Sequence, residues 1–154
     1  MKVNLFVAFA ASGLLLAGSA SAQEKKIKRS DLPPAVEKTV AAQSQGATIR
    51  GFSTEKEKDQ TLYEAEMTVN GHSKDISMTA DGSIVEIEEQ VALDSLSPEV
   101  KAGLQAKAGK GRILKVESLT KKDKLVAYEA KVDTDGKKSE VQVGPDGKPL
   151  DHEE

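Results

Sequence analysis

The chain has 154 residues, of which 22 are basic and 25 are acidic, so its formal net charge at pH 7 is -3. Charges of both signs are interspersed, whereas a surface that binds nucleic acid or acidic lipid needs clustered lysine and arginine. Cysteine does not occur, which excludes disulfides, thiolate metal sites and cysteine nucleophiles. The composition therefore favours one ordinary domain or two small ones, folded by packing alone.

The first residues have the pattern of a secretory signal peptide. One positive charge precedes an apolar stretch from Leu5 to Ala17, and small residues ending in Ala20-Ser21-Ala22 follow. A charged start, an apolar centre and an A-x-A end are typical of an exported chain. The apolar stretch falls short of the roughly 18–20 residues that a bilayer span needs. We predict a signal peptide over residues 1–22 with cleavage between Ala22 and Gln23, no stable membrane anchor, and a periplasmic or secreted product.

A basic run from Lys25 to Arg29 follows the predicted cleavage site. It is the only candidate for a nucleic-acid footprint, and it is short and isolated. We therefore expect residues 23–29 to form a solvated leader, and we expect no nucleic-acid partner.

The rest of the chain contains one segment twice. Four short motifs recur in the same order: a Leu-x-Pro-x-Val start (Leu32, Leu96), a Tyr-Glu-Ala strand (Tyr63, Tyr128), an Asn-Gly or Asp-Gly turn (Asn70-Gly71, Asp135-Gly136) and a terminal Asp-Gly turn (Asp81-Gly82, Asp146-Gly147). Such self-similarity indicates one supersecondary unit used twice. We predict a first repeat over residues 30–92 and a second over residues 93–154. The duplicated residues are those of turns and cores, with no catalytic set among them.

Each repeat is predicted to be a helix followed by antiparallel strands. Pro34 suits the first turn of a helix, and Ser97 suits an N-cap before Pro98. Residues 62–69 alternate between apolar and polar, which is typical of an antiparallel sheet covered on one side. The Asn-Gly and Asp-Gly pairs supply the positive φ values of type I′ hairpin turns. The predicted fold class is α+β, with two tandem repeats that each pack one helix on one face of a 3–4-stranded antiparallel sheet.

A single repeat holds too few large apolar residues to be more than marginally stable alone. We therefore expect the two repeats to pack together or to continue each other's sheet.

Catalytic and metal-binding motifs are scarce. His72 follows a turn and His152 lies near the C-terminus, and neither a G-x-S-x-G elbow nor a phosphate-binding glycine loop occurs. The run from Asp133 to Gly136 superficially resembles a calcium loop, but its glycine falls at the fourth position, inside a hairpin turn, rather than at the sixth. We predict no enzyme, no catalytic residues, no cofactor and no specific metal site.

The polar sheet face is the remaining candidate for function. The predicted partner-binding residues are Glu64, Glu66, Asp75, Glu86, Glu129 and Lys131. Glu88 follows Glu86 on the same side of its predicted strand. An acidic face of this kind could steer a basic partner or gather cations. The alternative interpretation is an ordinary solvated sheet face.

The helix start, the Tyr-Glu-Ala strand, the glycine hairpin and the terminal Asp-Gly turn resemble the PepSY-like module over residues 30–154. The tandem arrangement is similar to that of the β-lactamase inhibitor protein. The resemblance implies an exported, non-enzymatic module that binds or restrains another envelope or secreted protein, often a peptidase or other hydrolase. An alternative is a periplasmic protein that binds a small ligand or a cation.

The chain departs from the inhibitors of this architecture in one respect. Those inhibitors present aromatic residues on a concave sheet surface, and aromatic anchors dominate tight interfaces. Beyond the predicted signal peptide, only Phe52, Tyr63 and Tyr128 are aromatic. The two tyrosines occupy equivalent positions that we expect to face the core, so we do not expect a tight β-lactamase inhibitor.

Overall fold

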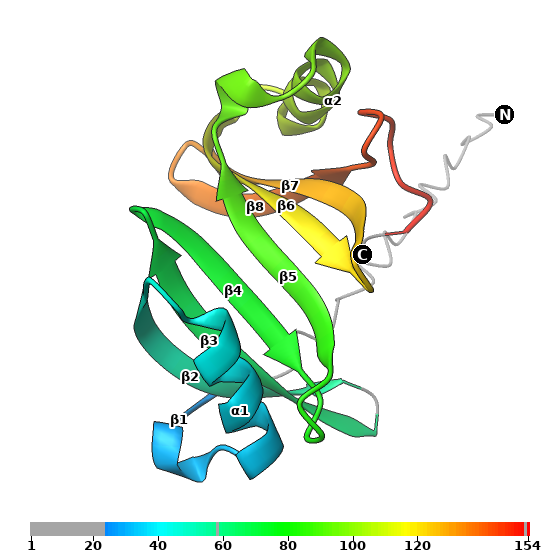
Figure 1. Ribbon diagram of the computed structural model, residues 1–154. Coiled ribbons are helices and arrows are strands. Elements are labelled where there is room, and N and C mark those ends of the chain that lie inside the picture. Colours follow the sequence, from blue (N-terminus) through cyan, green and yellow to red (C-terminus); the bar gives the residue numbers. More distant parts are fainter. Residues whose placement is uncertain (1–23, 58, 153) are drawn as a thin grey trace, which may run out of the picture.

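The computed structural model describes residues 24–57, 59–152 and 154, and it contains one antiparallel sheet of eight strands in sequential order. The strands are β1 (Lys25–Ile27), β2 (Ala47–Glu57), β3 (Gln60–Val69), β4 (His72–Met78), β5 (Ile84–Val91), β6 (Arg112–Lys121), β7 (Lys124–Thr134) and β8 (Lys137–Val143). Helix α1 (Pro34–Gln43) lies between β1 and β2, and helix α2 (Pro98–Ala108) lies between β5 and β6 (Figure 1). A short 3-10 helix precedes each of them, at Arg29–Asp31 and at Leu93–Ser95. The predicted signal peptide and its cleavage site lie outside the described residues.

The prediction of two separate sheets of three or four strands is wrong. β5, the last strand of the first repeat, pairs with β6, the first strand of the second, from Glu86 opposite Lys121 to Val91 opposite Val116. In a separate sheet, β5 would have presented an open row of hydrogen-bonding groups at its edge. Here β6 occupies that edge. The two repeats therefore continue each other's sheet, and the fold is one eight-stranded sheet with two short helices.

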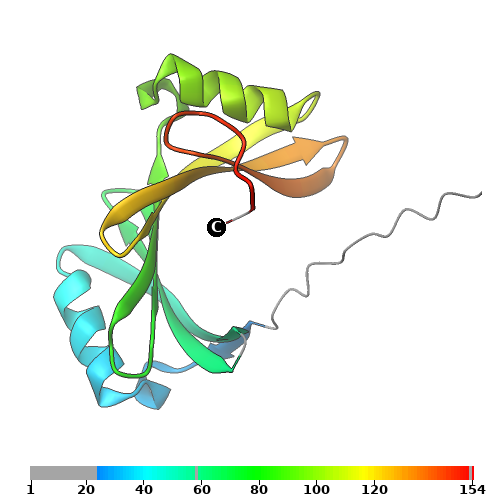
Figure 2. The ribbon, with the colours of Figure 1, turned by 90° about the vertical axis from the view of Figure 1, so that its right-hand side faces the viewer.

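Both helices pack on the same side of this sheet. Figure 2 shows that the sheet is strongly curved, with α1 and α2 on its outer, convex side and, among the described residues, no helix on its concave side. Two separate apolar clusters lie between helix and sheet, and a tyrosine packs against each of them, as predicted. The buried members of the first cluster are Leu32, Val36, Val40, Phe52, Ala65, Met67, Ile76 and Met78, and Tyr63 packs against them. Those of the second are Leu96, Val100, Leu104, Val116, Ala130, Val132 and Val143, and Tyr128 packs against them.

The residues predicted to start the helices and to form the hairpin turns do so in the structure. α1 begins at Pro34, and the Ser97 hydroxyl accepts a hydrogen bond of 3.2 Å from the Val100 amide at the start of α2. Asn70 and Gly71 have φ values of 51° and 86°, so both central residues of the β3–β4 turn are in the left-handed region. The β7–β8 turn repeats this geometry at residues 135–136. These conformations are those of a type I′ turn, which matches the twist of the paired strands.

Part of the predicted leader is a strand. Lys25–Ile27 form β1, which pairs with β2, and Ile27 packs against the first apolar cluster. Within the described ranges, no helix is long and apolar enough to cross a membrane.

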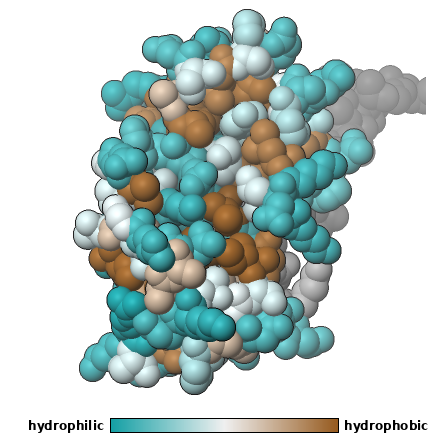
Figure 3. All heavy atoms as spheres, viewed as in Figure 1, coloured by the Kyte–Doolittle hydropathy of each residue, from teal (hydrophilic) through white to brown (hydrophobic). Residues whose placement is uncertain are grey.

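The convex side is partly open between the helices. Figure 3 shows apolar side chains gathered there among hydrophilic ones. A cleft of about 690 Å³ lies at the edge of α1, lined by Thr39, Ile84, Ile87 and Thr120 among others.

The terminal Asp-Gly turn of each repeat packs against the first turn of the helix, which explains why this glycine recurs. Gly82 and Gly147 have φ values of 80° and 77°. A Cβ atom on Gly82 would collide with the carbonyl of Ala35, and one on Gly147 would collide with the carbonyl of Glu99. The repeated motif therefore fixes the distance between helix and sheet.

We expect Gly147→Ala to lower the free energy of unfolding well beyond the cost of its positive φ. A left-handed alanine costs roughly 1–2 kcal/mol, and the collision with α2 adds about 1–3 kcal/mol. Gly136→Ala is the matched control, since Gly136 has a φ of 83° and a Cβ atom at this position would meet nothing within 4 Å. Urea unfolding of both variants measures the difference. Equal destabilisation would contradict a packing role for the turn.

Candidate functional site

All six predicted partner-binding residues lie on the concave face of the sheet. We use the term concave face for the side opposite the helices, which carries the outward-facing residues of β2 to β8. The register places Glu66 opposite Asp75 and Glu117 opposite Glu129. Glu64 accepts a hydrogen bond of 2.9 Å from the buried Ser53 hydroxyl. The structure thus brings together acidic side chains from both repeats on one surface.

Arg50 joins two of these carboxylates in the first repeat. Its Nη2 atom lies 2.8 Å from Asp75 Oδ1, and its Nη1 atom lies 3.7 Å from Glu66 Oε2. Its Nε atom donates to the Met67 carbonyl at 3.2 Å. Two donors of the guanidinium are engaged in hydrogen bonds and a third nitrogen faces Glu66, so Arg50 has a fixed position at this end of the face.

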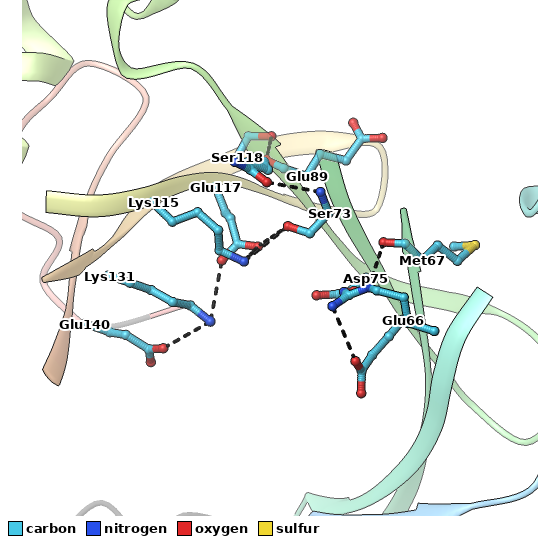
Figure 4. A network of polar contacts seen from close by, with 12 residues as sticks. Glu66, Met67, Ser73, Asp75, Glu89, Lys115, Glu117, Ser118, Lys131 and Glu140 are labelled. Carbon is cyan, nitrogen blue, oxygen red and sulfur yellow. Dashed lines mark hydrogen bonds and ion pairs between the residues drawn. The ribbon is translucent and has the colours of Figure 1, made fainter. Parts of the chain in front are cut away.

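Glu117 is the most buried charged side chain of the face. It is only 1% exposed, yet it carries a carboxylate. Lys115 Nζ lies 2.6 Å from Glu117 Oε1, and the Ser73 hydroxyl donates to the same oxygen at 3.2 Å. Lys131 approaches the other oxygen, Oε2, at 3.7 Å (Figure 4). Lys131 also pairs with Glu140 at 3.5 Å.

The C-terminal residues cross the concave side, as Figure 2 shows. Gln142 Nε2 donates to Glu129 Oε2 at 2.9 Å, and the Glu154 amide donates to Gln142 Oε1 at 2.9 Å. Lys121 pairs with Glu86 at 3.3 Å and with the Glu154 carboxylate at 3.5 Å. The predicted residues Glu86 and Glu129 are therefore both held near the end of the chain.

Glu88 has the most perturbed titration on this face. It lies opposite Asp75 on β5. Burial is the largest cause that raises its pKa, to about 8, and the charges of Glu86, Glu117 and Glu129 raise it further while Lys131 lowers it. Burial likewise raises the pKa of Glu64, Asp75 and Glu129 above their ordinary values. Carboxyl groups with raised pKa values that share a surface are typical of functional sites, although structural networks produce them as well.

Sequence reasoning missed several residues of this face. The sequence indicates Glu88 only as a neighbour of Glu86, and it does not assign Arg50, Lys115 or Glu117 to the face. The alternation of apolar and polar residues around Glu117 indicates only weakly which face its side chain joins. Register shifts between Ile113 and Lys115 and between Leu119 and Thr120 interrupt the period of two. Bulges of this kind shift which residues share a face.

Neither histidine belongs to the concave network. His72 is the exposed first residue of β4, opposite Val69, and His152 lies near Glu154 with its ring largely exposed. Phe52, Tyr63 and Tyr128 all belong to or pack against the clusters under the helices. In the part of the chain that the structure describes, the concave face therefore carries no aromatic side chain.

Known structures share this architecture. The chain is similar to a candidate periplasmic protein from Bacteroides eggerthii, with 19% identity and a TM-score of 0.62 over 77% of this chain and 86% of that one. It is similar to a DUF2874 family protein from Bacteroides ovatus, with 20% identity and a TM-score of 0.59 over 77% and 84% of the two chains. A BLIP-like protein from Bacteroides fragilis has 18% identity and a TM-score of 0.55 over 75% and 81%.

No protein-family model matches the sequence, and no curated protein matches it. At these identities the likeness to solved structures establishes the fold. The resemblance to the β-lactamase inhibitor protein is therefore confirmed as a BLIP-like fold, and membership of the PepSY-like family stays a prediction.

We expect Glu88→Gln to change how stability depends on pH. The folded state holds the Glu88 proton more tightly than the unfolded state, with a pKa of about 8 against an ordinary value of 4.5. Its contribution to stability is full below pH 4.5 and is lost as the pH rises through 8. Glu88→Gln should therefore be more stable than the wild type by a few kcal/mol at pH 9 and similar to it at pH 5. The size follows from about 1.4 kcal/mol of stability for every tenfold difference in proton affinity between the folded and unfolded states.

Thermal unfolding at pH 5 and pH 9 checks this expectation. Glu89→Gln is the control, because Glu89 is the next residue of β5, points to the opposite face and is half exposed. Glu89→Gln should change the Tm by the same amount at both pH values. If Glu88→Gln does so as well, the Glu88 pKa is not raised as described.

We expect Lys115→Met to destabilise the protein strongly. The substitution keeps the length of the side chain but leaves the buried Glu117 carboxylate without its closest cation, at a cost of about 3–5 kcal/mol. Lys148→Met is the control, since Lys148 forms a similarly short but exposed pair with Asp146 at 2.8 Å, and removing it should leave Tm unchanged. A loss below about 1 kcal/mol for Lys115→Met, in urea unfolding, would show that Lys131 alone compensates the charge.

Proposed function

We propose that this chain is an exported, non-enzymatic binding protein of the PepSY-like type, and that its concave face holds a basic segment of an envelope or secreted protein. The observation that carries the proposal is the single sheet. Because β5 pairs with β6, charged side chains from both repeats form one continuous surface, and neither α1 nor α2 covers it.

The charge of the face supports a basic partner. Its acidic side chains are Glu64, Glu66, Asp75, Glu86, Glu88, Glu117, Glu129 and Glu140, and its basic ones are Arg50, Lys115, Lys121 and Lys131. The acidic groups outnumber the basic ones, so lysine or arginine side chains of a partner would be attracted. Charge of this kind increases the rate of encounter and the specificity of binding more than the affinity.

The described residues of the concave face include no aromatic anchor, which lowers the affinity expected for a protein partner. Aromatic side chains in central pockets supply most of the energy of tight interfaces. We therefore expect binding that is weaker than that of an enzyme inhibitor and sensitive to salt.

The fold and the predicted signal peptide both favour a partner in the periplasm or outside the cell. A candidate periplasmic protein and a BLIP-like protein are among the structures that share the fold. Together with the predicted signal peptide, these neighbours support a role in the periplasm or outside the cell. By the resemblance to inhibitors of this architecture, a peptidase or other hydrolase is the partner that we would seek first.

A non-enzymatic role is supported by the position of the histidines. Both are exposed, and in the described ranges neither forms a hydrogen bond with a serine or an aspartate. A general base needs such a partner to hold its orientation.

The experiment is affinity capture of envelope and secreted proteins on immobilised residues 23–154 at low salt, followed by mass spectrometry and titration of the captured protein. We expect Glu64→Lys/Glu66→Lys to weaken binding at least tenfold and to flatten its dependence on salt. Glu99→Lys is the control, because Glu99 is exposed at the start of α2, on the other side of the sheet.

Melting curves of both variants verify that the fold is retained. Unchanged affinity of the double variant would reject the concave face as the binding surface. Capture of no protein, in several extracts, would reject a protein partner.

A further inference from the structure

Three carboxylates from three neighbouring strands converge at the centre of the concave face. Asp75 lies on β4, Glu88 lies opposite it on β5, and Glu117 lies on β6, opposite Gln90. One carboxylate oxygen from each of these residues lies within 4.8 Å of the other two. The cluster therefore spans the junction at which the first repeat meets the second.

The cations around this cluster leave part of it unpaired. Arg50 engages only Oδ1 of Asp75, and Lys115 engages only Oε1 of Glu117. The Glu88 side chain forms no hydrogen bond and no ion pair with any other described residue. Each of the three residues therefore retains at least one oxygen without a hydrogen-bond donor.

Glu117 Oε2 is a second observation that points to a ligand at this cluster. This atom is buried and has no hydrogen-bond partner in the described structure, and its side chain is 1% exposed. Lys131 Nζ, at 3.7 Å, is too distant for a hydrogen bond. A buried acceptor without a donor costs about 1–3 kcal/mol, and more when it is charged. A buried acceptor of this kind calls for a partner, and a water, an ion or a proton can supply the missing contact.

The geometry points to a divalent cation held by Asp75, Glu88 and Glu117, with calcium preferred over magnesium. Calcium binds carboxylate and water oxygens at about 2.3–2.6 Å, so two of its ligands can lie up to roughly 5 Å apart. Magnesium binds at about 2.0–2.1 Å, which limits this separation to roughly 4 Å. Separations of up to 4.8 Å are within the reach of calcium, which also accepts irregular sets of carboxylates more readily than magnesium does. Water would complete its coordination.

The cation would act on the junction between the repeats. Its ligands come from β4 and β5 of the first repeat and from β6 of the second, so binding would cross-link the strands that join them. It would also offset the repulsion among the three carboxylates. This inference goes beyond the proposed function, because it does not require a protein partner.

A proton is the competing occupant. If Glu88 is protonated, its hydroxyl can donate to a neighbouring carboxylate, and no cation is then needed. The two occupants differ in their dependence on solution conditions, since calcium binding must compete with protons and strengthen as the pH rises.

The test is calorimetric titration of calcium-free residues 23–154 with CaCl2 and with MgCl2, in 150 mM NaCl at pH 8.5, together with thermal unfolding. We expect saturable binding of one Ca²⁺, a Tm that rises with its concentration, and a weaker response to Mg²⁺. Glu88→Gln should weaken Ca²⁺ binding at least tenfold, and Glu117→Gln should do the same.

Glu89→Gln is again the control, because it removes one carboxylate of the same strand from the opposite face. It should bind Ca²⁺ as the wild type does. The inference is overturned if 10 mM Ca²⁺ gives neither heat nor a shift in Tm, if Glu88→Gln responds as the wild type does, or if Mg²⁺ acts as strongly as Ca²⁺. The first of these outcomes would exclude a divalent cation as the occupant, and it would leave the capture experiment on the concave face unaffected.

Discussion

The antiparallel pairing of β5 with β6 is the constraint on which the rest of the structure depends. It converts two duplicated units into one sheet, and it places Glu117 of the second repeat beside Asp75 and Glu88 of the first. Side chains alternate between the two faces of a strand. Because both apolar clusters lie under the helices, the intervening polar residues of both repeats must point to the same concave side. Without the pairing, Glu117 would lie on an edge strand and would be hydrated.

The concave face is costly to the fold. Removing a carboxylate from water costs several kcal/mol, and an ion pair recovers this only when its geometry is good. Lys115 provides such a contact for one oxygen of Glu117, at 2.6 Å, while Glu88 has no cation of its own among the described residues. Apolar residues of similar size would stabilise this region better. The stability that supports the charged face must therefore come from the two clusters on the convex side, whose helices are fixed by the close approach of Gly82 and Gly147.

The sequence was sufficient for the features that are set by local chemistry. The Asn-Gly and Asp-Gly turns, the N-cap of Ser97 and the inward direction of Tyr63 and Tyr128 follow from backbone sterics and from a period of two. The number of sheets did not follow, because β5 could equally end one sheet or continue into another, and nothing local distinguishes an edge from an interior strand. The pairing of β5 with β6 is a tertiary contact across an intervening helix. The candidate site was predicted only in part. Glu117 and Lys115 were missed because they lie on β6, whose bulges interrupt the alternation. Arg50 was missed because it lies at a bulge of β2.

The edges of the sheet bear on where a partner can bind. A strand edge can accept another strand unless it is short or charged. β1 is only three residues long and contains Lys25 and Lys26, and β8 begins with Lys137 and Lys138, which are exposed. Exposed lysines on an edge strand disfavour pairing with a further strand. Both edges thus resist extension of the sheet by a second chain. This is consistent with the proposal that a partner binds the concave face, where charge is concentrated and no helix of the described residues lies.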